Sequence, residues 1–404
     1  MRGRDMEAEV LKNTQFIYEV ALARLELGAL GADAEITNGF RIFNIKKPDS
    51  IKTLIDRLAY FKRVGSESTL YSKLITYNQT RSINQYLTHW FYPYKGKFHP
   101  QMIRALLNYS QVKPGDLVLD PYMGSGTACL EAQVLGIDSI GVDISPVCNL
   151  ISKVKTQSVE VLDEIMDESS EIVNKSNGNS IANFGEKNGE RLDDAIAKIK
   201  NEKVRNFFQV AKLISHSDES RRGRNFNTQF KNNVEKMLVS VKDYQRAIKK
   251  HGLKIGKTTI KQGDARELPL DGKSVDAIVT SPPYSIALDY VKNDAHALKA
   301  LGEDVTKIRD GFIGVRGSNG TKLQLYDGDL KKTYDEMYRV LKPKKVCSIV
   351  IGNATFQGQE VKTVELTVDY CQSLGFQLEK NVEKIIFGLY NVMQKENILI
   401  FRKE

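Results

Sequence analysis

The stretch TSPPYS, residues 280–285, combines a hydroxyl group, a Pro-Pro corner and an aromatic ring, groups that could act together on a ligand. It follows the apolar run VDAIV, residues 275–279, which predicts a buried strand. Proline has no N–H, so a rigid corner at Pro282 presents oxygens without competing donors. The Ser281 hydroxyl and the Pro282 carbonyl can accept hydrogen bonds from an exocyclic base amine and so localise its lone pair. The Tyr284 ring can stack on a base that has left its helix.

A second motif, DPYMGSGTACLEA at residues 120–132, predicts a ligand loop between a strand and a helix. In open parallel sheets, ligands bind at the carboxyl ends of strands. Gly124 and Gly126 allow the backbone to approach a ligand closely. Asp143 ends the next predicted strand, in GVDIS, where an acid can accept both ribose hydroxyls of a nucleoside. Asp120 would repel a phosphate but could hold a cationic amino group.

A third acid, Asp264, follows another predicted strand in QGDARELP and can accept from an adenine amino group. No GxxxxGK[ST] sequence is present, so a cradle for nucleotide phosphates is not expected. These acids favour S-adenosylmethionine over a dinucleotide.

Around these motifs, short apolar strands alternate with helices. This alternation predicts an α/β fold with a Rossmann-like, doubly wound, mostly parallel sheet. Before it, residues 6–29 are helix-like, residues 34–45 indicate a hairpin around Asn-Gly, and residues 49–64 predict a capped helix. The predicted organisation has four parts. These are a small α+β domain at 1–75, a linker at 76–96, the Rossmann-like domain at 97–150 and 256–404, and a basic helical insertion at 151–255.

Together, DPYMGSGT, GVDIS, GDA and VTSPPY resemble the nucleic-acid amino-methyltransferases of the class I S-adenosylmethionine-dependent type. YKGKFHPQMIRALL is similar to the motif of that family just upstream of its Gly loop. The resemblance covers about residues 94–150 and 258–403. The SPPY form is more typical of enzymes that modify the N4 amine of cytosine, whereas DPPY and NPPY forms are more typical of adenine-N6 or guanine-N2 enzymes. The absence of a Pro-Cys pair disfavours a cytosine-C5 mechanism.

The resemblance implies a set of site residues. The catalytic set is Ser281, Pro282, Pro283 and Tyr284. The S-adenosylmethionine set is Phe98, His99, Pro100, Asp120, Tyr122, Gly124, Gly126, Thr127, Asp143, Ile144, Asp264 and Ala265. Tyr290 and Asp294, in LDYVKNDAHAL, would line the same pocket.

Two features depart from the family pattern. The Gly loop precedes SPPY, and an insertion of about 105 residues separates the second strand from GDA. The N-terminal unit weakly resembles the ferredoxin-like domain of archaeal tRNA guanine-N2 methyltransferases. The leading hypothesis is cytosine-N4 methylation of DNA. The alternatives are the same chemistry on rRNA or tRNA, adenine-N6 methylation, and a non-catalytic nucleic-acid-binding protein.

The excess of basic residues indicates an anionic partner. The chain has a formal net charge of +9, and residues 195–254 hold fifteen Lys/Arg and five Asp/Glu, a local net of +10. Residues 151–194 carry a local net of −5, with five basic and ten acidic residues. We therefore expect a nucleic-acid face in the insertion. Its candidate contacts are Arg221, Arg222, Arg224 and Phe226 with Phe230, and Tyr290 beside the SPPY motif.

The composition excludes several other classes. The four cysteines form no CxxC pair and have no ligand-like histidine nearby, so we expect buried thiols and no metal site. No run of 18 apolar residues exists, so no membrane span is expected. The charged start MRGRDMEAEV is unlike a secretion signal, which favours a cytoplasmic protein.

Overall fold

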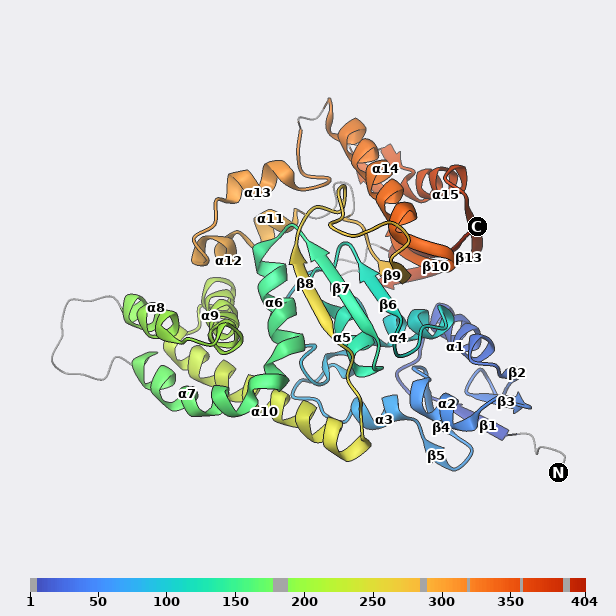
Figure 1. Ribbon diagram of the computed structural model, residues 1–404, viewed down its shortest axis with the longest axis horizontal. Coiled ribbons are helices and arrows are strands. Elements are labelled where there is room, and N and C mark those ends of the chain that lie inside the picture. The colour runs from blue at the N-terminus through green and yellow to red at the C-terminus, as the bar shows by residue number, and fades with distance from the viewer. Residues whose placement is uncertain (1–5, 177–187, 284–288, 318–319, 357–358, 388–392) are drawn as a thin grey trace.

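The computed structural model describes residues 6–176, 188–283, 289–317, 320–356, 359–387 and 393–404. Figure 1 shows a central sheet with helices around it, a small N-terminal sheet at one end and a helical lobe at one side.

The central sheet has seven strands in the order β13-β14-β10-β9-β6-β7-β8. The five strands from β10 to β8 pair in parallel, whereas β14 pairs antiparallel with both β10 and β13. This is the predicted doubly wound, mostly parallel sheet. The strands are β6 (Leu117–Asp120), β7 (Asp138–Asp143), β8 (Thr258–Gln262), β9 (Val275–Thr280), β10 (Leu341–Gly352), β13 (Phe376–Phe387) and β14 (Met393–Lys403).

Both faces of this sheet are covered, because successive residues of each strand point to opposite sides. In β9, Ala277 and Val279 pack with α4 (Pro100–Tyr109) and α5 (Thr127–Val134). Ile278 packs on the other side, with α14 (Lys322–Val340) and α15 (Thr363–Ser373). The continuous apolar run of β9, buried at all six positions, follows from this two-sided burial.

The N-terminal sheet has five antiparallel strands in the order β2-β3-β1-β4-β5. Its elements are β1 (Met6–Val10), α1 (Ile17–Ala29), β2 (Asp33–Thr37), β3 (Ile42–Lys46), α2 (Ile51–Arg57), β4 (Phe61–Val64), β5 (Glu67–Ser68) and α3 (Leu70–Leu74). The prediction of helix across residues 6–29 is wrong at its start. MEAEV is too short to distinguish helix from strand by pattern, and pairing with both β3 and β4 makes it a central strand.

One apolar cluster joins the N-terminal sheet to the central one, since side chains of β1, α1 and β3 pack with those of α4, β9 and β10. A polar contact reinforces this junction. The buried Glu26 carboxylate accepts from the Ala59 and Tyr60 amides and from the Asn108 side chain of α4. Burial raises the pKa of Glu26 to about 7, although these three donors oppose the shift. The two sheets therefore share one core, and the division into domains at residue 75 stays a prediction.

Residues 76–96 were predicted as a linker, but the structure packs them into the interior. Apart from η1 (Ile83–Gln85), the segment has no helix or strand. Tyr86, Leu87, Phe91 and Tyr92 are nevertheless at most 1% exposed and pack against α5, α6 (Pro146–Gln157) and α10 (Phe226–His251). Aromatic side chains without periodicity can pack in this way, and no pattern in the sequence distinguishes that from a linker.

The insertion is helical, as predicted. Its elements after α6 are η2 (Ser158–Val161), α7 (Leu162–Ser176), α8 (Asn188–Lys198), α9 (Glu202–Arg222) and α10. Asn201 and Asn225 cap the starts of α9 and α10 with their side chains. The long helices α9 and α10 pack against each other, and α6 and η2 tie them to the sheet. They form the lobe at the left of Figure 1.

The remaining short elements are α11 (Tyr290–Asn293), α12 (Ala295–Ala300), α13 (Val305–Gly311), β11 (Ala354–Phe356) and β12 (Gln359–Val361). All four cysteines are buried, as predicted: Cys129, Cys148, Cys347 and Cys371. In the described part of the chain, no helix combines the length and apolarity needed to cross a membrane.

Candidate active site

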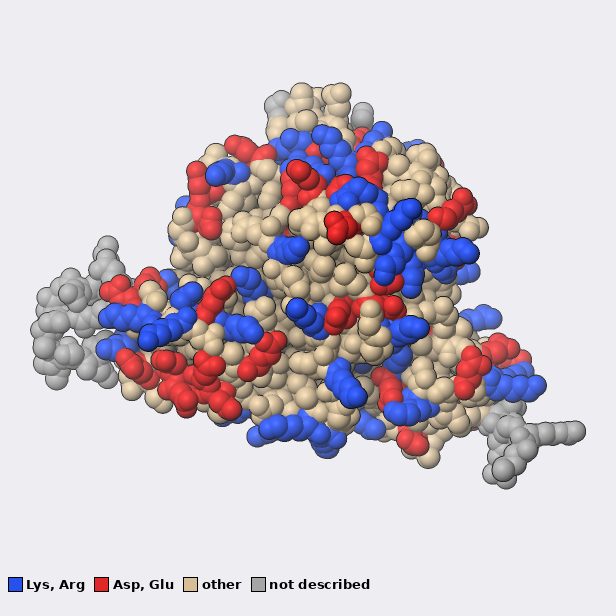
Figure 2. Space-filling model, viewed as in Figure 1, with Lys and Arg blue, Asp and Glu red and all other residues tan. Residues whose placement is uncertain are grey.

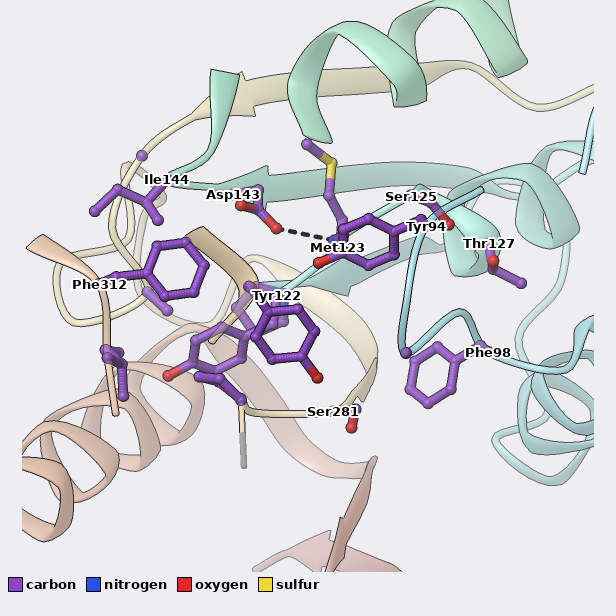
Figure 3. Close-up of a pocket in the computed structure, with 18 of the residues that line it drawn as sticks. Tyr94, Phe98, Tyr122, Met123, Ser125, Thr127, Asp143, Ile144, Ser281 and Phe312 are labelled. Atoms are coloured by element: carbon purple, nitrogen blue, oxygen red, sulfur yellow. Dashed lines mark hydrogen bonds between the residues drawn. The ribbon is translucent and has the colours of Figure 1, made fainter. Parts of the chain in front are cut away.

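A cavity lies at the carboxyl ends of β6, β7, β8 and β9, the edge at which the three motifs were predicted to meet. It encloses about 760 Å³, including the space at its mouth. Figure 3 shows that its wall combines the Gly loop, the end of β7, the SPPY strand end and aromatic rings from outside the sheet. The predicted site residues on this wall are Phe98, Tyr122, Gly124, Thr127, Asp143, Ile144, Asp264, Ala265, Ser281, Pro283 and Tyr290.

The Gly loop is held from behind by helix α6. Ser152 donates to the Gly124 carbonyl at 3.1 Å, and Lys155 donates to the Ser125 carbonyl at 2.7 Å. Gly124 has a φ of +49°, and a side chain there would meet the Tyr94 ring at 2.9 Å. Lys155 is fully buried, so its amino group is dedicated to this loop, and burial holds its pKa well below the ordinary value. The loop backbone is thus fixed before any ligand arrives.

Asp143 closes the loop from the end of β7. One carboxylate oxygen accepts from the Gly124 N–H at 2.9 Å, the bond drawn as a dashed line in Figure 3. The other accepts from the Ser145 N–H at 2.8 Å. Burial raises the pKa of Asp143 to about 6, although both backbone hydrogen bonds oppose the shift. Each carboxylate oxygen has a second lone pair, which can serve a hydroxyl group in the cavity.

Asp264 meets a partner that the sequence reasoning missed. Arg266 forms a bidentate pair with the Asp264 carboxylate, with nitrogen–oxygen distances of 2.6 and 2.9 Å. The same guanidinium reaches the buried Asp329 at 3.0 Å and the Gly311 carbonyl at 2.9 Å. Burial acts to raise the pKa of Asp264, but the hydrogen bonds and charge of Arg266 outweigh it and lower the pKa. Asp264 is therefore ionised at neutral pH and fixed in orientation.

The SPPY corner reaches the cavity with Ser281 and Pro283. The Pro283 carbonyl accepts from the Tyr326 hydroxyl of α14 at 2.9 Å, which fixes the corner against the sheet. Pro282 is buried and does not line the cavity. Tyr284 lies outside the described residues.

Four predicted cofactor residues do not line the cavity: His99, Pro100, Asp120 and Gly126. His99 caps the start of α4 and its ring pairs with the Asn84 side chain at 3.0 Å. Pro100 is the first residue of that helix. Gly126 was expected to approach a ligand, but it approaches α6 instead. A side chain at Gly126 would meet the Ser152 hydroxyl at 2.6 Å.

Asp120 lies behind the wall. It is 1% exposed, and one carboxylate oxygen accepts from the Thr280 hydroxyl at 2.7 Å. Burial raises the pKa of Asp120 to about 7, although the bonds from Thr280 and the Tyr122 N–H oppose the shift. The other oxygen, Oδ2, has no partner within the described residues.

An aromatic wall extends from the predicted Tyr290 to two residues that were not predicted, Tyr94 and Phe312. Tyr94, Tyr290 and Phe312 line the cavity and stack in sequence, with centroid separations of 6.1 and 6.4 Å. Tyr94 is the first residue of the YKGKFHP motif, so this motif could have indicated it. Phe312 had no signal, because it follows the unremarkable helix α13. The other lining residues without a prediction are Gly96, Lys97, Pro121, Met123, Ser125, Gly263, Gly311 and Ile313.

The predicted nucleic-acid contacts of the insertion gather at the turn between α9 and α10. Arg221, Arg222 and Arg224 are exposed, and Arg221 donates to the Asn293 carbonyl of α11 at 3.3 Å. Because Tyr290 begins α11, this turn borders the cavity wall. Arg222 pairs with Asp218 at 2.8 Å, so its charge is partly balanced.

The two phenylalanines predicted to contact bases at this turn differ in exposure. Phe230 is 0% exposed and packs in the core, so the prediction that it stacks on bases is wrong. Phe226 is half-buried and lies between His216 and Phe230, with centroid distances of 4.5 and 6.1 Å. Asp294 is also buried, where it accepts from the Tyr92 hydroxyl at 2.9 Å. Figure 2 shows acidic side chains interspersed with basic ones over this lobe, so the +10 segment does not form a face of one sign in that view.

The cavity fits the expected cofactor by its unmet hydrogen bonds. The Ser125 and Thr127 hydroxyls line the cavity, and both oxygens are buried without a partner in the described structure. Buried polar groups are normally paired, so these two await a ligand group. With the Asp143 and Asp264 carboxylates, they offer both donors and acceptors to a nucleoside that carries an amino acid.

The chain matches a known protein family over its central part. Residues 91–311, more than half of the chain, match the family described as UPF0020, RMKL-like methyltransferase domain. The match includes the Gly loop, the insertion and the SPPY strand end.

Curated relatives fall into two groups. The type II methyltransferase M.BsoBI of Geobacillus stearothermophilus is 23% identical over 73% of this chain and 67% of its own length. M.MjaII of Methanocaldococcus jannaschii, also a type II methyltransferase, is 45% identical over 18% of this chain and 14% of its own. The tRNA (guanine(10)-N2)-dimethyltransferase of Methanothermobacter thermautotrophicus is 42% identical over 14% of this chain and 16% of its own. The chain thus spans only a small part of the relatives that it matches at higher identity.

Solved structures are more distant. A SAM-dependent methyltransferase of Methanosarcina mazei is 12% identical and covers 74% of this chain and 96% of its own, with a TM-score of 0.34. TrmN of Thermus thermophilus is 14% identical and covers 81% and 55%, also with a TM-score of 0.34. Scores this low carry no argument, and the class I fold rests on the observed strand order and directions.

Proposed function

The chain belongs to the UPF0020 family of RMKL-like methyltransferase domains, and we propose that it methylates the exocyclic N4 amine of cytosine in DNA. Membership of this methyltransferase family, together with the fold, implies that S-adenosylmethionine is the cofactor. The observation that carries the proposal is the position of Ser281 on the wall of the cavity that also holds the Gly loop and Asp143.

The chemistry follows from the oxygens at the SPPY corner. The lone pair of an exocyclic amine is delocalised into its ring, so the amine attacks poorly unless acceptors hold its N–H groups. We assign this role first to the Ser281 hydroxyl, which is on the cavity wall. The Pro282 carbonyl is the second proposed acceptor, but Pro282 does not line the cavity, so this carbonyl would have to turn toward it when the base binds. Tyr284 would stack on the displaced base. The anchor between Pro283 and Tyr326 keeps the corner in place. The remaining contribution of the chain is alignment of the amine with the methyl donor.

Different residues of the cavity would bind the ribose, adenine and amino acid parts of the cofactor. Asp143 would accept the ribose hydroxyls and Asp264 the adenine amine, with Ile144 and Ala265 beside them on the wall. The free Ser125 and Thr127 hydroxyls would bind the amino acid part, next to Phe98. Asp120 has an unpaired oxygen but lies behind Pro121 and Tyr122, so its contact with the amino group would need a small shift of that wall. The cofactor supplies an electrophilic methyl group when bound.

Two observations support cytosine in DNA. The SPPY form of the motif is more typical of the cytosine-N4 enzymes that the sequence resembles. A relative that aligns over 73% of this chain is a type II methyltransferase, which supports DNA as the substrate. Adenine-N6 methylation would use the same site, and the identity of the product distinguishes the two.

RNA is the second candidate substrate. The specific observation is the 42% identity to tRNA (guanine(10)-N2)-dimethyltransferases over short segments. The chemistry at Ser281 would be unchanged, because cytidine in rRNA or tRNA carries the same amine. A non-catalytic binding protein is a third candidate, and it predicts that the loss of Ser281 has no consequence.

The test is methyl transfer with labelled cofactor to duplex DNA and to total RNA in separate reactions. We expect label in DNA, and expect Ser281→Ala to slow transfer about 100-fold while cofactor affinity stays within about twofold. Ser66→Ala, at an exposed position away from the cavity, is the matched control and should behave as the wild type. Label in RNA alone would support the second candidate, and full transfer by Ser281→Ala would contradict the assigned mechanism.

A further inference from the structure

A second concave surface lies apart from the cofactor cavity, between the N-terminal sheet and the end of α10. We call it the lysine groove. Four lysines line it: Lys12 after β1, Lys62 on β4, Lys73 on α3 and Lys250 on α10. In Figure 1, the end of α10 lies beside α3 and β5 at the lower edge of the molecule. Figure 2 shows Lys and Arg side chains gathered over that end of α10.

Positive charge in the lysine groove is poorly balanced. Lys62 pairs with Glu9 at 3.1 Å, but no ion pair is formed by Lys12, Lys73 or Lys250 within the described residues. The lining includes no acidic side chain. Burial lowers the pKa of His251, and the charges of Lys250 and Lys73 lower it further, so both ammonium groups act on the same point. Such a cluster of like charges favours an anionic ligand.

The rest of the lining suits a phosphodiester backbone. The Ser68 hydroxyl lies among the lysines, whereas the Ser72 and Thr76 hydroxyls of the lining donate to the Thr69 and Lys73 carbonyls. Hydroxyls and lysines are both common donors to phosphate oxygens. Tyr77 adds a half-buried ring, which meets His251 edge-on at a centroid distance of 6.3 Å.

Two contacts connect the lysine groove to the rim of the cofactor cavity. Asn13, on the groove lining, donates to the Gln101 side chain at the start of α4 at 2.8 Å. Ile83 also lines the groove, and its neighbour Asn84 pairs with the His99 ring. Phe98, one residue before His99, lines the cofactor cavity. Residues on or next to the groove lining thus contact the start of α4, and Phe98 just before this helix lines the cavity.

We propose that the lysine groove binds the phosphodiester backbone of the nucleic-acid substrate, at nucleotides away from the one that enters the cofactor cavity. This inference rests on the proposed function, since it concerns the substrate of the same site. Backbone contacts supply affinity and orientation and carry no sequence information. The groove therefore contributes to substrate binding and not to the choice of base.

The test removes the three unpaired charges together, as Lys12→Gln, Lys73→Gln and Lys250→Gln. The control triple variant, Lys113→Gln, Lys175→Gln and Lys362→Gln, removes three exposed charges from elsewhere on the surface. Fluorescence anisotropy measures Kd for a 30-base-pair DNA duplex and for an RNA hairpin, each at several salt concentrations. Cofactor affinity and the thermal midpoint establish that both variants are folded.

We expect the groove variant to bind the preferred nucleic acid roughly tenfold more weakly at 0.15 M salt. For duplex DNA the slope of log K against log salt should fall by about 0.9 per lysine removed. Cofactor affinity should not change, and the control variant should match the wild type. The arm with the larger loss identifies DNA or RNA as the ligand.

The outcomes separate this inference from the proposed function. If the wild type binds and methylates neither nucleic acid, the proposed function fails. If the wild type binds and methylates one of them, and the groove variant has the same affinity and salt slope, only the groove inference is overturned. The groove inference is also overturned if the control variant loses as much affinity as the groove variant.

Discussion

At the scale of single residues, burial determines how the site titrates. Asp143 and Asp120 both have raised pKa values, about 6 and about 7, because burial disfavours their charged forms. Arg266 instead keeps Asp264 ionised. The acids around one cavity therefore differ in protonation near neutral pH, which makes cofactor binding pH-dependent.

Cofactor affinity should fall as the pH drops below about 6. The Asp143 carboxylate accepts hydrogen bonds, and protonation converts one acceptor into a donor. Above pH 7 the affinity should be level, and below pH 6 it should weaken by up to about tenfold per pH unit, as expected for one linked proton. Calorimetric titration with S-adenosylmethionine from pH 5 to 8 measures this. Asp143→Asn should bind weakly and lack the step near pH 6, whereas Asp120→Asn should keep that step. If the affinity of Asp143→Asn still fell near pH 6 as in the wild type, Asp143 would not be the group that titrates.

Lys155 should matter to cofactor binding although it does not line the cavity. Lys155→Met retains the packing of the side chain but leaves the Ser125 carbonyl without its donor. A buried unsatisfied carbonyl costs about 1–3 kcal/mol, so we expect cofactor Kd to rise roughly tenfold as the loop loosens. Lys153→Met is the control, since that lysine is on the same helix and pairs with Glu202 at the surface. Equal effects of the two variants on Kd would contradict a role for Lys155 in positioning the loop.

At the scale of elements, a buried polar cluster joins α5, α4 and the segment 76–96. Glu131 of α5 accepts from His89 at 2.8 Å, from Arg104 at 2.7 Å and from the Tyr86 hydroxyl, and all four side chains are 0% exposed. Burial alone would raise the pKa of Glu131, but the charge of Arg104 and the three hydrogen bonds outweigh it and lower the pKa to about 2. This cluster explains how a segment without helix or strand is held in the interior.

Glu131→Gln should destabilise the fold by about 3–5 kcal/mol, because it leaves the buried Arg104 without a counter-charge. Glu160→Gln, which breaks a surface pair with Lys203, should cost at most about 1 kcal/mol. Urea unfolding measures both free energies. The pKa of Glu131 is lower in the folded state than the ordinary 4.5. Its contribution is therefore complete above pH 4.5 and is lost as the pH falls toward 2. A similar cost for both variants would argue against the cluster.

The elements also show what the sequence could predict. The strands at 117–120, 138–143 and 275–280 are short apolar runs bounded by turn residues, and they form where expected. The strand at 6–10 was missed because its partners lie more than 30 residues away in the chain. Arg266 on Asp264 and Phe312 on Tyr290 were missed because tertiary packing alone brings them together.

At the scale of the whole molecule, the N-terminal sheet, the class I sheet and the helical insertion share buried clusters. The insertion places its arginine turn beside α11, and the N-terminal sheet forms the lysine groove with α10. The bulk charge predicted an anionic partner but not this groove, because Lys12, Lys73 and Lys250 are far apart in the sequence. The arginine turn thus contacts α11, which begins at the cavity-lining Tyr290, and the lysine groove contacts the start of α4, next to the cavity-lining Phe98.

We propose that this chain methylates the N4 amine of cytosine when the base enters the cavity beside Ser281. The most direct measurement is mass spectrometry of nucleosides from DNA and RNA that the purified chain has modified with labelled S-adenosylmethionine. The proposed function predicts N4-methylcytosine in the DNA digest, and its loss in the digest from Ser281→Ala. Label on the N6 amine of adenine or the N2 amine of guanine, or on no nucleoside, would contradict it.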